Sequence, residues 1–118
     1  MTALVAALAL AVAGPPPASL VAGKLETRLA VSSWCWAGHC GAPIAAAAKT
    51  TPVARGVRVA VTLAFVPKRA LVSVAGRPMA VTISGRELTW RATRGGGLTV
   101  SVSTGKSFVV YVGRIRLR

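Results

Sequence analysis

Hydrophobic and polar residues alternate along most of the chain after residue 24. The clearest run covers residues 57–65, where Val, Val, Val, Leu and Phe take turns with Arg, Ala, Thr and Ala. Successive side chains of a β-strand point to opposite faces, so this period of two predicts strands with one buried and one exposed face. The polypeptide is therefore expected to fold as an all-β domain.

Turn-forming residues divide the alternating region into about seven strands, a number typical of an Ig-like antiparallel β-sandwich. Residues 43–52 carry no alternation and are interpreted as a crossover loop. The glycines at 95–97 are also expected to form a loop, because Gly weakens a strand interior. The predicted strands cover residues 24–33, 57–65, 71–75, 79–84, 88–93, 98–103 and 107–117.

Residues 1–13 form an apolar run rich in Ala and Leu. The run is shorter than the roughly 20 residues that a membrane-spanning helix needs, and it matches the hydrophobic region of a signal peptide. We expect export, with the small residues Ala11 and Ala13 preceding a cleavage site at Gly14. Because no Lys or Arg precedes the run, two alternatives stay open: a start upstream of Met1, and a buried N-terminal helix.

Residues 14–23 contain three successive prolines and are expected to form an extended linker. Proline has no N–H to donate to a sheet, which argues against a central strand here. Residues 24–118 then remain as one folded domain, the Ig-like β-sandwich.

The charge of the chain favours an anionic partner. Fifteen Lys and Arg residues accompany only two acidic residues, which gives a net charge of +13. Codon bias in a GC-rich genome would explain Arg in place of Lys, but it does not explain the near absence of acids. The chain contains no recognisable nucleic-acid-binding module. The expected partner is therefore an anionic cell-envelope polymer, a glycan or another protein, and membrane contact is expected only through the signal segment.

Residues 33–40 hold both cysteines, the only histidine and two of the three tryptophans. In an exported protein, Cys35 and Cys40 are expected to form a disulfide, which stabilises so short a loop by about 2 kcal/mol. Metal binding by both cysteines and His39, and free thiols, are the alternatives, although zinc normally takes four ligands. The order Cys-x-x-x-His-Cys differs from the haem-attachment motif, so no cofactor is expected.

Trp34 and Trp36 would lie on one face of a continuing strand. Carrying the alternation forward from the preceding residues places both indoles outward, as an aromatic platform for a sugar ring or a partner surface. The alternative is a bulge near Ser32 and Ser33, which would reverse the alternation and bury at least one indole. Trp90 falls on the inward face of its own strand and is predicted to lie in the core.

Arg114, Arg116 and Arg118 alternate with hydrophobic residues at the end of the chain. On a strand they share one face at intervals of about 7 Å, a spacing that suits contacts to a phosphate-bearing polymer. The alternative is a solvated edge strand that its charges protect from aggregation.

The residue content argues against catalysis. The chain has no Asp to orient His39, and its only carboxylates, Glu26 and Glu87, lie in no supporting motif. The glycines at 95–97 lack the residues of a phosphate-binding loop. The chain is therefore predicted not to be an enzyme.

Residues 33–40, the valine-rich strand that follows and the Phe65-x-Pro67 pair resemble small exported bacterial proteins with an Ig-like sandwich. Gly41 departs from that pattern, in which an acidic residue often follows the second cysteine. The resemblance implies a fold and an exported location, and no activity. The expected function is that of a secreted cationic binding module, and the alternative is a structural or accessory protein without a ligand of its own.

Overall fold

The computed structural model describes residues 14–41 and 49–118, and the regular structure in these residues consists of strands. The predicted all-β class is therefore confirmed at this level. The predicted signal peptide, residues 1–13, and most of the predicted crossover loop lie outside the described residues.

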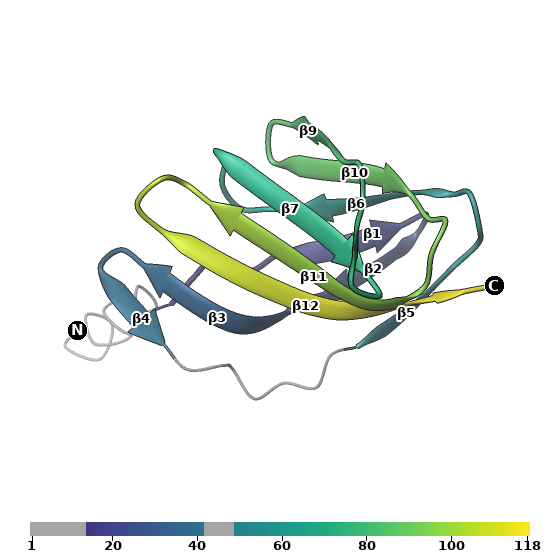
Figure 1. Ribbon diagram of the computed structural model, residues 1–118, viewed down its shortest axis with the longest axis horizontal. Helices are drawn as coiled ribbons and strands as arrows, with labels where there is room; N and C mark the ends of the chain where they lie inside the picture. Colours follow the sequence, from purple (N-terminus) through teal and green to yellow (C-terminus); the bar gives the residue numbers. More distant parts are fainter. Residues whose placement is uncertain (1–13, 42–48) are drawn as a thin grey trace, which may run out of the picture.

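The strands form two sheets (Figure 1). The five-stranded sheet contains, in spatial order, β2 (Leu25–Arg28), β1 (Ser19–Ala22), β6 (Arg58–Thr62), β10 (Glu87–Arg91) and β9 (Thr82–Ser84). The seven-stranded sheet contains β4 (His39–Gly41), β3 (Ala30–Trp36), β12 (Phe108–Leu117), β11 (Gly96–Ser103), β7 (Arg69–Val74) and β8 (Arg77–Pro78), and β5 (Thr50–Val53) pairs with β12. All these pairings are antiparallel except that of β5 with the C-terminal part of β12.

The core lies where the inward faces of the two sheets meet. Because side chains alternate along each strand, every second residue of β6, β10, β11 and β12 is buried there. Trp90 is 4% exposed and belongs to this core, as its position in the sequence predicts. The largest fully buried side chains of the core are those of Tyr111, Leu20, Leu88, Leu98 and Ile115.

The predicted linker contains a strand. Within residues 14–23, β1 pairs with β2 on one side and with β6 on the other, and Leu20 is fully buried. The prediction of a linker across this range is therefore wrong beyond the prolines. The prolines end at residue 17, so every residue of β1 keeps the N–H that a central strand needs.

The single strand predicted over residues 24–33 is two strands in different sheets. The chain leaves the five-stranded sheet after β2, passes through Leu29, whose N–H donates to the Ala18 carbonyl, and enters the seven-stranded sheet as β3. Leu25, expected on the buried face, is 44% exposed because β2 is the edge strand of its sheet.

Two segments expected as loops contribute strands. Three of the four residues of β5 fall within residues 43–52, and the Oγ1 hydroxyl of its buried Thr51 donates to Thr27 Oγ1 of β2 at 2.9 Å, which links the two sheets. β11 begins at Gly96, whose φ of 130° favours glycine and where an added Cβ would lie 3.0 Å from that of Ala75. The predicted strand over residues 79–84 is shorter, because only Thr82–Ser84 pairs with β10.

Tyr111 ties the N-terminal segment to the core. Its side chain is fully buried, and its hydroxyl donates a hydrogen bond of 2.6 Å to the Pro16 carbonyl. Burial raises the pKa of the Tyr111 phenol well above its ordinary value. The hydrogen bond fixes the polyproline segment at the point where β1 begins.

Replacing Tyr111 with Phe should lower the free energy of unfolding by about 1–3 kcal/mol, because the buried hydrogen bond is lost and the Pro16 carbonyl is left without this donor. Urea denaturation measures the change.

The stability of the wild type should also depend on alkaline pH. Because burial raises the phenol pKa, the unfolded state should release the phenolic proton at a lower pH than the folded state, and the free energy of unfolding should fall as pH rises above about 10. Tyr111 is the chain's one tyrosine, so the variant should lack this part of the alkaline loss. An unchanged alkaline slope would show that another group causes it.

Candidate functional site

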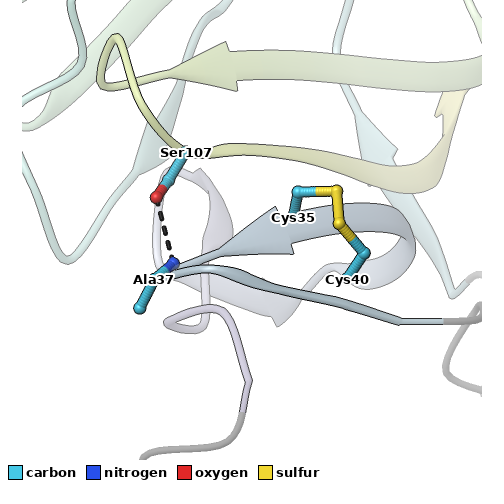
Figure 2. Close-up of a disulfide and its surroundings, with 4 residues drawn as sticks. All are labelled: Cys35, Ala37, Cys40 and Ser107. Atoms are coloured by element: carbon cyan, nitrogen blue, oxygen red, sulfur yellow. Dashed lines mark hydrogen bonds between the residues drawn. A yellow bond between two sulfur atoms is a disulfide. The ribbon is translucent and has the colours of Figure 1, made fainter.

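The cysteines lie in a tight hairpin formed by β3 and β4. Cys35 and Cys40 are directly opposite each other in the strand pairing and form a disulfide, as predicted (Figure 2). Ala37 and Gly38 form the turn, with positive φ angles of 53° and 83° that match a two-residue primed turn. The Ala37 N–H donates to Ser107 Oγ at 3.1 Å, which joins this turn to the turn between β11 and β12.

A bulge in β3 decides where the tryptophans point. Ser33 pairs with Val110 but Val31 pairs with Tyr111, so Ser32 is an extra residue in the strand. One extra residue reverses the alternation beyond it. Trp34 therefore pairs with the buried Val109 and faces inward. The predicted outward pair of indoles is wrong, and the alternative of a bulge at this position is confirmed.

Both indoles are half-buried and pack against the core. The Trp34 ring lies directly against Gly41 of β4, in space that any side chain at residue 41 would occupy. The Trp36 and Phe65 rings lie 4.8 Å apart at a tilted angle. The indoles thus hold the hairpin against the sandwich, and they do not form a fully exposed aromatic platform.

The outward side chains of β12 form a continuous surface strip, here called the β12 stripe. Arg114 and Arg116 are exposed at one end of the stripe, and the exposed Arg118 follows it. β12 lies inside its sheet, between β11 on one side and β3 and β5 on the other. The alternative of a charged edge strand is therefore wrong. The stripe consists of Phe108, Val110, Val112, Arg114 and Arg116.

Small side chains flank the arginines of the stripe. Arg114 lies opposite Gly97 in β11 and Thr50 in β5, and Arg116 lies opposite Pro52. These neighbours are too short to cover the guanidinium groups. The outward row of β11 continues beyond Gly97 with hydroxyl-bearing residues, which lie opposite the apolar residues of the stripe: Thr99, Ser101 and Ser103.

The other end of the stripe borders a largely apolar hollow of about 460 Å³. Phe108 and Val110 form one side and Leu71 of β7 the other, with the two serines of β11 between them. Leu71 is 73% exposed and Phe108 is 42% exposed, so the hollow belongs to an exposed apolar patch. One sheet face therefore combines an apolar end with a cationic end.

The acidic residues lie away from this face. Glu26 and Glu87 both belong to strands of the five-stranded sheet, and Glu87 lies beside Arg86. Within residues 14–41 and 49–118, no group of three or more His, Cys, Asp and Glu side chains is placed to bind a metal ion. His39 is exposed at the start of β4.

In comparisons with known proteins, no protein-family model, curated protein or solved structure matches the chain. In the described part of the chain, no helix has the length and hydrophobicity needed to cross a membrane.

Sequence reasoning found the arginine end of the stripe but not its apolar end. The alternation along this strand places its even-numbered residues on the face of the arginines. It would have identified three more residues as outward: Phe108, Val110 and Val112. Sequence reasoning also missed a separate cleft, because its arginines come from distant parts of the chain. They are Arg58, Arg77, Arg91 and Arg94.

Replacing both Cys35 and Cys40 with Ser should lower the free energy of unfolding by about 2 kcal/mol, since the closed loop is short. The fold should persist, because β4 is an edge strand and the core lies elsewhere. Denaturation of the oxidised wild type and the variant measures the difference. A variant that fails to fold would show that the hairpin organises the whole sandwich.

Replacing Gly41 with Ala should destabilise the protein by about 1–3 kcal/mol, because the new methyl group overlaps the Trp34 ring. The near-ultraviolet circular dichroism of the tryptophans should change as well. Gly97→Ala is the matched control, because open space surrounds that position. Equal effects of the two substitutions would argue against the packing of Trp34 on Gly41.

Proposed function

We propose that this protein is a secreted, non-catalytic binding module with an Ig-like sandwich fold, and that its partner is an anionic polymer of the cell envelope or the extracellular space. The β12 stripe is the proposed contact surface. A phosphate-bearing polymer would run along it and pair with Arg114, Arg116 and Arg118. The disulfide is compatible with the oxidising compartment that this role requires.

The unneutralised charge of the stripe carries this proposal. Two carboxylates cannot neutralise fifteen cationic side chains, and both carboxylates belong to the opposite sheet. Guanidinium groups bind phosphate through two parallel hydrogen bonds, and small neighbours leave this geometry open here. The arginines of the stripe recur at intervals of about 7 Å, a spacing that fits a polymer with repeated anionic groups better than a single small anion.

The apolar end of the stripe would contact the backbone of the polymer. Phe108 and Val110 provide a surface on which a sugar ring or an alkyl segment can pack, and the hydroxyls of Ser101 and Ser103 lie beside it. In this proposal Trp34 and Trp36 support the hairpin next to Phe108 and make no large contact of their own. Cys35 pairs with Phe108 in the sheet, so the disulfide steadies this end of the stripe.

Retention on immobilised poly(glycerol phosphate) tests the proposal. The wild type should be retained at low salt and released at high salt, because exposed charges are screened. Replacing Arg114, Arg116 and Arg118 together with Gln should weaken binding roughly a hundredfold, at about 1 kcal/mol for each charge near an anionic surface.

The matched control removes the same charge away from the stripe. Arg28, Lys68 and Arg86 are all exposed and line neither of the hollows beside the stripe and Arg118, and their triple Gln variant keeps the β12 stripe intact. Its affinity should fall much less than that of the stripe variant. Equal losses would mean that net charge alone attracts the polymer. Absence of retention at low salt would favour a structural or accessory protein without a ligand.

A further inference from the structure

A second cationic surface lies apart from the β12 stripe, beside β8 and β9, each an edge strand of its sheet. It is a cleft of about 720 Å³, within the usual size range of pockets for small organic ligands. The lining residues come from β6, β8, β9 and β10, from the segment that crosses from β8 to β9 and from the loop after β10. They include Arg58, Arg77, Met79, Trp90, Arg91 and Arg94.

Four arginines and no acidic residue line this cleft. Arg58 and Arg91 are directly opposite each other in the pairing of β6 with β10. Like charges in such a cross-strand pair repel each other, so the arrangement costs stability unless an anion lies between them. The nearer acid along β10, Glu87, is four residues from Arg91, or about 14 Å at the rise of an extended strand. The lining contains no acidic residue that could neutralise the pair.

The open edge of β10 adds further hydrogen-bond donors. β9 reaches only as far as Thr82, opposite Thr89, so Arg91 has no partner strand on that side. In an antiparallel ladder alternate residues direct their N–H groups to alternate sides, and Ala92 donates to Val57 on the β6 side. The Arg91 N–H therefore points toward the edge occupied by the cleft. The Arg91 side chain is held in place by a hydrogen bond of 3.1 Å from Nη1 to the Gly56 carbonyl.

The remaining lining indicates what accompanies the anion. Met79 and Trp90 provide apolar surface, and the hydroxyls of Thr82, Thr89 and Thr93 provide hydrogen-bonding groups. The Trp90 indole N–H is buried and donates to no residue that the structure describes. A bare anion would leave most of the cleft volume unfilled. The lining suits an anion joined to a small organic group that carries hydroxyls.

We propose that this cleft binds a phosphate ester, with the phosphoryl group between Arg58, Arg77 and Arg91 and the organic part against Met79 and Trp90. Several guanidinium groups favour a doubly charged phosphoryl group over a carboxylate, since each can donate two parallel hydrogen bonds to its oxygens. The ester is either a free small molecule or a unit of a phosphate-bearing polymer. The cleft site is separate from the β12 stripe and does not depend on polymer binding there.

Titration with glucose 1-phosphate at constant ionic strength tests this site. Binding should saturate and should shift the NMR signal of the Trp90 indole N–H, while the signals of Trp34 and Trp36 in the β3–β4 hairpin stay in place. Glucose should not bind, and glucuronate should bind much more weakly. Equal binding of glucuronate, or a shift that never saturates, would overturn the assignment of a phosphate-ester site.

Variants locate the site. Arg58→Gln and Arg77→Gln change exposed residues of different sheets, and each should weaken glucose 1-phosphate binding about tenfold through loss of a charge-assisted contact. Arg116→Gln removes the same charge from the β12 stripe and should leave the affinity unchanged. Equal weakening by all three would mean that net charge, and not the cleft, binds the ligand. Thermal unfolding of each variant verifies that the fold is intact.

A titration with poly(glycerol phosphate) identifies the source of the ester. If the polymer shifts the Trp90 signal, and Arg58→Gln abolishes the shift, the cleft takes a unit of the polymer. If the polymer binds without moving that signal, the cleft takes a free phosphate ester. Either result can occur whether or not retention depends on Arg114, Arg116 and Arg118, so the cleft and the stripe are tested separately.

Discussion

The alternation of side chains along β12 is the constraint on which the rest of the structure depends. β12 is the longest strand, runs through the middle of the larger sheet and contacts β3, β5 and β11 (Figure 1). Each of its residues can serve only one face. Val109, Tyr111 and Ile115 fill the inward face and close the core. The outward side chains of β12 do not contribute to the core, and they form the stripe, which has arginines at one end. The same alternation therefore buries one set of β12 side chains and leaves the other set on the surface.

The second constraint is electrostatic. The fifteen cationic side chains of this small chain repel one another, and two carboxylates cannot offset a net charge of +13. The fold leaves most of its cations exposed, on strands and on the turns between them, where water and salt screen them. The cleft at the edge of β10 is the exception, because Arg58 and Arg91 are directly opposed. An acid in one of these two positions would turn the repulsion into an attraction, so the pair of arginines costs stability. This is the physical argument for anionic ligands at the cleft, and it applies in weaker form to the β12 stripe.

The disulfide hairpin has a supporting role in this arrangement. It is the most unusual stretch of the sequence, and its two tryptophans predict a ligand-binding platform. The bulge at Ser32 instead turns Trp34 toward the sandwich, where its ring rests on Gly41. Cys35 pairs with the first residue of the stripe, Phe108. The disulfide and both tryptophans thus support the framework, while outward residues of β12 and β10 form the two proposed binding surfaces.

The sequence by itself determined the all-β class, the inward position of Trp90, the disulfide and the shared face of the C-terminal arginines. These properties depend on the local alternation of side chains or on the short separation of two cysteines, and both can be read directly from neighbouring residues. Only the tertiary structure decided that Ser19–Ala22 is a central strand, that β12 lies inside its sheet and that β3 carries a bulge. It also brought Arg58 and Arg77 to one cleft. Strand order and register arise from contacts between residues far apart in the chain, which no local pattern specifies.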